Sequence, residues 1–322
     1  MKSEEKLFNF IRKKVPESLS FTDEIAQVLE INYDAAYRRI SGKTAVSLQE
    51  VLKLMEAFDF SITDVFSDKK DFIRVTKKEG VNSVDKLGEY FSLASTELRE
   101  ISKFQSSEII YSAKDIPVYY SYKSYRKFKM FAFLNVLSDQ FNFKRIAFKD
   151  FDNNDYLSTK LKQLEDIYES VATTEIWSSD TLTSSINQIM YFFKSKILEQ
   201  EDALLIIEDF LKTIQKIEHQ CTTGKRGSNN NKVFKFYSND LLNLNNTIFM
   251  QGEKTQKFFV PYTTLSYIKI ADPDTCDEAL KYLKKQLEFS KQLSGDSALE
   301  RTIFFNEMYK KINKLKSIIK LG

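Results

Sequence analysis

The sequence predicts a mainly α-helical protein with two domains. We expect five helices over residues 1–68, a linker over 69–81, and an α-rich domain over 82–322 with a small antiparallel sheet near 233–270. Glycine and proline are scarce, with 8 and 4 among 322 residues, so few positions suit the tight turns of an all-β fold. Apolar residues recur at helical spacing through most of the chain. The length also exceeds that at which one core usually stops growing, which favours two or more domains.

Five short amphipathic segments follow one another in the first 66 residues. The first four have a start or stop signal of the kind that bounds helices, namely a polar capping residue, a proline or a terminal glycine. The fourth begins with a capping box, in which a serine and a glutamate three residues later satisfy each other's backbone groups. The segments are Leu7–Val15, Ser20–Leu29, Tyr33–Ile40, Leu48–Phe58 and Ser61–Phe66, and the signals are Pro16, Ser20 or Thr22, Asn32, Gly42, and the pair Ser47 and Glu50.

Only three residues separate the second segment from the third, which is helix-turn-helix organisation. Ala26 provides a small residue where the third helix must pass closely, Ile31 is apolar after the turn, and Ala36 and Ile40 form a buried side. In this pattern the first fifth of the chain resembles the lambda-repressor/Cro-type DNA-binding domain. The sequence departs from that pattern at Glu30, where glycine is usual. A glutamate there needs a left-handed conformation, at a cost of about 1 kcal/mol or more.

Segments further along the chain resemble a family of bacterial helix-turn-helix transcriptional regulators with a long C-terminal domain. The similar segments are Ile109–Pro117, Phe128–Phe131, Glu175–Trp177 and Glu300–Asn306. The resemblance implies one continuous two-part regulator. It carries no catalytic residue over to this chain.

The third helix is the expected recognition helix, and its exposed face is expected to carry Tyr33, Asp34, Tyr37, Arg38 and Arg39, with Lys43 just beyond. Arginine can pair with guanine or phosphate, and tyrosine can stack or donate to phosphate. The alternative is a solvated face with an Asp34–Arg38 ion pair, worth a few tenths of a kcal/mol (about 0.2–0.5). Residues 1–66 carry nine Lys/Arg and eleven Asp/Glu, a net charge of −2, which argues against a purely electrostatic binder. The candidate DNA-binding residues are Thr22, Asn32, Tyr33, Asp34, Tyr37, Arg38, Arg39 and Lys43.

The larger domain is expected to be helical over 82–222 and α+β over 230–322. Its first helix, about Asn82 to Tyr111, carries an apolar stripe that could form a dimer seam or pack within its own domain. The lysines within 123–129 are expected on a solvated face, and Lys225–Lys232 in a polar loop. The stripe is Val84, Leu87, Phe91, Ala94, Leu98 and Ile101, and the expected strands are Val233–Tyr237, Thr247–Met250, Lys257–Val260 and Leu265–Ile270.

Several classes of function are disfavoured by composition. The net charge is only +3, so any nucleic-acid-binding patch must be local. One histidine (His219) and two cysteines (Cys221 and Cys276) leave no metal-binding cluster, and no phosphate loop, nucleophile elbow or zinc-protease motif occurs. We therefore predict no catalytic residues, no metal and no cofactor. Without a signal peptide or a stretch of about 18 apolar residues, the expected location is cytoplasmic, with no membrane partner.

These observations predict a transcriptional regulator that is not an enzyme. The N-terminal domain would read operator sequences in double-stranded DNA, and the larger domain would supply dimerisation, effector sensing or both. A small-molecule or peptide effector would bind between 82–219 and 233–270, since clefts favour such boundaries. The C-terminal helices are the second candidate for a homodimer seam. The principal alternative is a protein-interaction or antitoxin-like module with a degenerate helix-turn-helix, and an enzyme with a regulatory DNA-binding domain is a third class.

Overall fold

A computed structural model describes residues 3–16, 19–66, 73, 75–77, 80–120, 122–137, 146–151, 155–227, 231–253 and 255–322. The chain divides into two compact units, Met1–Arg74 and Val75–Gly322. Each unit has its own hydrophobic core, so each is described by itself.

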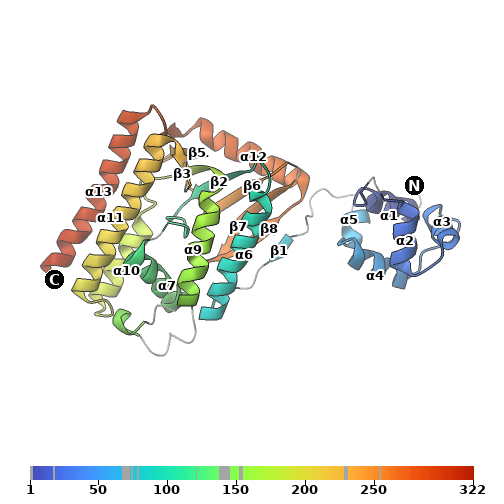
Figure 1. Ribbon diagram of the computed structural model, residues 1–322, viewed down its shortest axis with the longest axis horizontal. Coiled ribbons are helices and arrows are strands. Elements are labelled where there is room, and N and C mark those ends of the chain that lie inside the picture. Colours follow the sequence, from blue (N-terminus) through green and yellow to red (C-terminus); the bar gives the residue numbers. More distant parts are fainter. Residues whose placement is uncertain are drawn as a thin grey trace. The chain divides into compact units, whose positions relative to one another are not determined.

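Among the described residues of the N-terminal unit, five helices lie at the positions that the sequence indicates (Figure 1). The predicted capping box is present, with the Ser47 side chain accepting from the Glu50 backbone and the Glu50 carboxylate accepting from the Ser47 backbone. The core draws on four of the helices and on Phe60. The helices are α1 (Ser3–Arg12), α2 (Phe21–Leu29), α3 (Tyr33–Ile40), α4 (Leu48–Ala57) and α5 (Ile62–Phe66), and the core residues are Leu7, Phe8, Ile11, Ile25, Leu29, Ala36, Leu54 and Phe60.

The larger unit is built on a nine-stranded mixed sheet within the described residues, in the order β1-β8-β7-β6-β2-β3-β5-β4, with β9 also paired to β5. The centre is parallel, because β2 pairs with β3 and β3 with β5 in that sense. On the other side of β2, strands β6, β7, β8 and β1 continue in antiparallel pairs. The strands are β1 (Val75–Lys77), β2 (Glu108–Ala113), β3 (Ala172–Trp177), β4 (Lys225–Arg226), β5 (Lys232–Ser238), β6 (Thr247–Gln251), β7 (Gln256–Thr263), β8 (Ser266–Ile270) and β9 (Lys291–Gln292).

The predicted fold class was therefore wrong for the larger domain. Its sheet is large and mixed, and it is not a small antiparallel sheet confined to residues 233–270. The prediction missed β2 and β3, which occupy the centre. Buried parallel strands lack the alternation of polar and apolar residues that marks an exposed strand, and the helix expected from Asn82 to Tyr111 overlaps the first residues of β2. Strands from both 82–222 and 230–322 pair in this one sheet.

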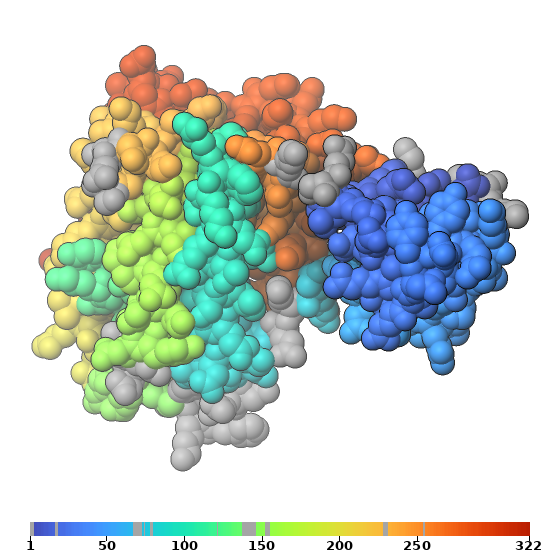
Figure 2. Space-filling model, turned by 45° about the vertical axis from the view of Figure 1, so that its right-hand side comes forward, coloured from blue at the N-terminus to red at the C-terminus, as the bar shows by residue number. Residues whose placement is uncertain are grey.

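Helices cover both faces of the sheet. On one face, α12 packs against Ile110 of β2 and Phe249 of β6. The other face forms the main core with the remaining helices; α6 and α9 lie side by side there, as do α11 and α13 (Figures 1 and 2). The helices are α6 (Val84–Ser102), α7 (Lys123–Leu137), α9 (Asp155–Glu169), α10 (Thr183–Lys194), α11 (Gln200–Thr223), α12 (Pro273–Glu288) and α13 (Ala298–Leu321), with a 3₁₀ turn η1 (Phe148–Asp150).

The apolar stripe of α6 faces the core of its own unit. Leu87, Phe91, Leu98 and Ile101 are fully buried there. The helix ends at Ser102 rather than near Tyr111. Because the stripe already packs against the sheet and α9, it is not available as a seam for a second chain.

Candidate nucleic-acid interface

The turn between α2 and α3 contains a residue in the left-handed conformation. Glu30 lies in the left-handed region, with φ 58° and ψ 40°. The chain then reverses, and the Ile31 backbone N–H donates to the Ala26 carbonyl at 3.0 Å. The Glu30 carboxylate is exposed and pairs with Lys53 of α4 at 2.6 Å, and the hydrogen bond and charge of Lys53 lower the pKa of Glu30. A glutamate thus occupies the position where the resembled domain usually has glycine.

The start and end of α3 are defined by local hydrogen bonds. Asn32 caps the helix, with its side-chain oxygen accepting from the Ala35 N–H at 2.8 Å. At the other end Gly42 has φ 68°, a conformation in which glycine is favoured. The Arg38 carbonyl accepts from the Lys43 N–H at 2.9 Å, which holds the exposed Lys43 beside the end of the helix.

One side of α3 is committed to the core of the N-terminal unit. Ala36 is fully buried, and Arg39 turns toward α4, where its Nε donates to Glu50 at 2.6 Å. The same guanidinium donates to the Ala35 carbonyl at 3.2 Å. Partial burial raises the pKa of Glu50, but hydrogen bonds from Ser47 and Arg39 outweigh it and place that pKa below its usual range. Arg39 therefore holds α3 against α4, away from the exposed side of the helix.

The opposite side of α3 is exposed, and it brings four of the predicted residues together. Tyr33 and Tyr37 are each 52% exposed, and Asp34 and Arg38 lie beside them. In the part of the chain that the structure describes, no ion pair joins Asp34 to Arg38, so the Arg38 guanidinium is available to a partner. Thr22 stands apart from this group as the second residue of α2, where it is partly buried and Ser20 is the cap. We call Tyr33, Asp34, Tyr37, Arg38 and Lys43 the α3 face.

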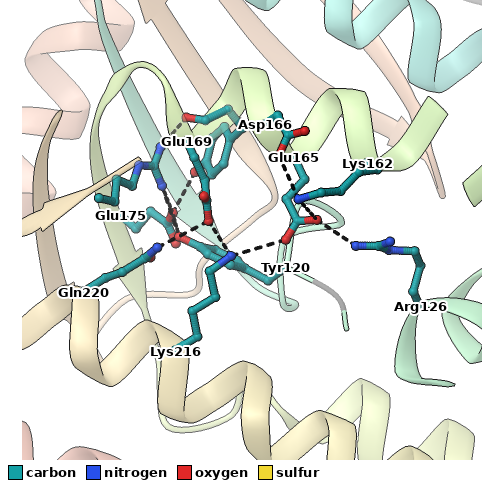
Figure 3. Close-up of polar contacts among 11 residues, drawn as sticks. Tyr120, Arg126, Lys162, Glu165, Asp166, Glu169, Glu175, Lys216 and Gln220 are labelled. Atoms are coloured by element: carbon teal, nitrogen blue, oxygen red, sulfur yellow. Dashed lines mark hydrogen bonds and ion pairs between the residues drawn. The ribbon is translucent and has the colours of Figure 1, made fainter. Parts of the chain in front are cut away.

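The larger unit contains a buried polar cluster that the sequence analysis missed (Figure 3). Glu175 of β3 is fully buried and accepts hydrogen bonds from Tyr120 at 2.5 Å, Tyr168 at 2.7 Å and Trp177 at 2.8 Å. Arg226 is fully buried beside it, 3.4 Å from the same carboxylate. Burial raises the pKa of Glu175, while the charge of Arg226 and the three donors act in the opposite direction.

Arg226 also donates to residues of α9 and β3. Its guanidinium donates to the Tyr168 carbonyl at 2.8 Å and to the Thr173 hydroxyl, and it lies over the Tyr168 ring, 4.2 Å from the centroid. Nothing in its sequence context, Lys225–Lys232, distinguishes it from an arginine in a polar surface loop. The mutual hydrogen bonds and the complete burial of both charged groups indicate a structural role for this cluster.

Other kinds of site find less support. Among the described residues, no group of three or more His, Cys, Asp or Glu side chains could hold a metal ion. A membrane crossing needs about 20 mainly apolar residues in one helix, and none of the helices described above has such a stretch.

No protein-family model matches the chain, and no curated protein and no solved structure matches it.

Proposed function

We propose that this chain is a sequence-specific DNA-binding transcriptional regulator. In this proposal α3 enters the major groove of operator DNA, and the larger unit supplies dimerisation, effector sensing or both. The location that goes with this function is the bacterial cytoplasm.

The observation that carries the proposal is the geometry of α2, the turn and α3. The left-handed Glu30 lies in the short turn between α2 and α3, and the burial of Ala36 shows which side of α3 points outward. That outward side carries a guanidinium without an ion-pair partner among the described residues, flanked by two phenols. Arginine paired to guanine is the commonest specific contact in the major groove, and tyrosine donates to phosphate.

A second candidate is a protein-interaction or antitoxin-like role for the N-terminal unit. The observation in its favour is an apolar exposed surface on α4 and α5, formed by Leu48, Leu52 and Ile62. The net charge of −2 over residues 1–66 points the same way. DNA binding and its salt dependence separate the two candidates, because phosphate contacts make log affinity fall linearly with log salt concentration.

Arg38→Ala is expected to weaken binding to the preferred sequence by about 1–3 kcal/mol, because it removes a base-reading or phosphate-pairing guanidinium. The preferred sequence is first selected from random duplex DNA with the full-length protein. Fluorescence anisotropy at several salt concentrations then gives the affinity of each variant. If Arg38 reads a base, discrimination against a changed base pair falls together with affinity.

Arg99→Ala is the matched control, because it removes the same charge from an exposed helical position of the larger unit. Its DNA affinity should equal that of the unchanged protein. If the unchanged protein binds no DNA sequence with salt-dependent affinity, or if Arg38→Ala binds as tightly as Arg99→Ala, the α3 face is not the recognition surface.

We also expect a homodimer, since one helix-turn-helix reads few base pairs and such units act on half-sites about 34–36 Å apart. With the α6 stripe buried, the remaining candidate seam is the C-terminal helices, where α13 exposes Leu299 and Ile303. Light scattering at micromolar concentration should report a dimer, and Ile303→Asp should shift it toward monomer. Leu241→Asp, at an exposed loop position, is the control. A monomer that binds one half-site as tightly as a palindrome would contradict this expectation.

A further inference from the structure

Two cavities in the larger unit adjoin each other. One has a volume of about 370 Å³ and the other of about 420 Å³, within the range of small-molecule sites. They share four lining residues, so they lie on either side of the same side chains. The shared residues are Tyr90 in α6, Tyr267 in β8, and Tyr119 and Leu265 in turns.

The smaller cavity, here called the apolar cavity, lies between α6 and the antiparallel half of the sheet. Leu93 and Ala94 line it from α6, and Ile248, Met250 and Phe259 line it from β6 and β7. Binding is favoured when an apolar group displaces water from such a surface, by roughly 25 cal/mol per Å² of apolar area buried. Charged residues of α6, β1 and β8 also line this cavity, namely Lys77, Lys86, Glu89, Glu97 and Lys269.

The larger cavity, here called the polar cavity, begins where β2 ends. Lys114 and Asp115 follow that strand directly, and Asn246 precedes β6 at the same edge. The strand order changes direction at β2, because β3 and β5 continue on one side while β6 returns on the other. The carboxyl end of β2 and the start of the antiparallel β6 therefore lie together at the edge of the sheet where these residues line the cavity.

Lys129 of α7 lines the polar cavity and is only 5% exposed. Its Nζ lies 3.5 Å from the Ser185 hydroxyl, which also contacts Tyr125, and 5.1 Å from the Phe133 ring centroid. In the described chain it forms no ion pair. Burial lowers the pKa of Lys129 to about 8, against the opposing charge of Asp115, so the group is mostly protonated at pH 7. This buried ammonium has one long hydrogen bond and no contact ion pair, since Asp115 lines the same cavity but does not pair with it, and burying a charge without a paired partner is unfavourable.

A second polar group in this cavity also lacks a partner. The side-chain oxygen of Gln188 on α10 is buried without a hydrogen bond to any described residue. Buried acceptors in folded proteins are nearly always paired. The cavity therefore offers a positive charge to one atom of an occupant and an acceptor to another, while the neighbouring cavity offers an apolar surface.

We propose that the two cavities form one binding site for an amphipathic carboxylate, which places its carboxylate on Lys129 and its apolar body between α6 and β6–β8. A donor next to the carboxylate, or a bound water, would satisfy Gln188. The binding of this ligand follows from the cavities alone, whereas a role as effector rests on the proposed DNA-binding function.

The proposal is tested by calorimetric titration of the full-length protein with octanoate and 3-phenylpropanoate, each beside its amide. The amides have the same apolar body but no charge. At least one carboxylate should bind about tenfold or more tightly than its amide, because charge-assisted hydrogen bonds are roughly twice as strong as neutral ones. If neither carboxylate binds at millimolar concentration, or if each amide binds as well as its acid, the proposal is overturned.

Two variants distinguish the contribution of the ligand's carboxylate from that of its apolar body. Lys129→Met keeps the length of the side chain, so it should abolish the preference for acid over amide and raise the melting temperature of the free protein. Lys284→Met, at an exposed position of α12, should change neither quantity. Ala94→Phe fills part of the apolar cavity and should weaken the binding of acids and amides alike. An unchanged preference in Lys129→Met would assign the carboxylate elsewhere and refute the site.

A DNA titration at saturating octanoate tests the effector role separately. A changed DNA affinity supports that role, because a regulator's ligand must bind its two states with different affinity. An unchanged affinity refutes the role of octanoate-like acids in regulation. A protein that binds no DNA under any condition refutes the proposed function, while the calorimetric result still decides whether the site exists.

Discussion

Arg226→Met is expected to lower the free energy of unfolding of the larger unit by about 3–5 kcal/mol. The reason is that Glu175 would remain fully buried without its positively charged neighbour, and the Tyr168 carbonyl would lose a charged donor. Removing one member of a buried ion pair leaves an uncompensated charge in a medium of low dielectric constant. Urea denaturation followed by tryptophan fluorescence measures the loss, since Trp177 itself donates to Glu175.

The double variant Glu175→Leu/Arg226→Met isolates the charge effect. It should recover part of the lost stability, because no buried charge remains, although Tyr120, Tyr168 and Trp177 lose their acceptor. Arg99→Met is the control for the loss of an exposed arginine, and it should change the free energy of unfolding by less than about 0.5 kcal/mol. A cost below about 1 kcal/mol for Arg226→Met would mean that water reaches this cluster.

Leu54→Ala is expected to unfold the N-terminal unit and leave the larger unit folded. Leu54 of α4 is 0% exposed, and truncation of a buried leucine costs about 2–5 kcal/mol. A domain of this size is stable by only several kcal/mol, about 0.05–0.15 per residue, so such a loss removes most of its stability. Because the two units have separate cores, we expect two calorimetric transitions, of which only one moves. DNA binding should be lost with the N-terminal unit.

Leu52→Ala is the matched control on the same helix, at a side chain that is 52% exposed. It should change the free energy of unfolding of neither unit by more than about 0.5 kcal/mol. A single cooperative transition that moves as a whole in Leu54→Ala would show that the two units do not unfold independently. DNA binding that survives the loss of the N-terminal transition would place the DNA contact outside that unit.

Local signals predicted the N-terminal unit well, because most of its element boundaries are set by neighbouring residues. The capping box of Ser47 and Glu50, the cap at Asn32 and the stop at Gly42 act over three or four residues. Such contacts do not depend on the rest of the fold. The unusual residue of the turn was also identified, since the Glu30 backbone conformation follows from its place between two helices.

The same signals were insufficient for the larger unit. The strands β5 to β8 were predicted from short runs of β-branched and aromatic residues. The central strands β2 and β3 were missed, because a strand buried on both faces shows no alternation. The sequence places Lys129 within a basic helix and Arg226 within a polar loop. Their burial could not be read from neighbours in the sequence.

What the sequence by itself determined about this protein is the series of helices, their caps, and the side of α3 that faces outward. Periodicity and capping are properties of residues close together in the sequence, so they can be recognised without knowledge of the fold. Only the tertiary structure decided that Arg226 lies beside Glu175 and that Lys129 lines a cavity at the end of β2. Both depend on which strands pair across more than 50 positions of the chain, as in the pairing of Glu175 with Phe236. The environment of a charged side chain is set by that pairing, and the same lysine or arginine would be solvated on any other surface.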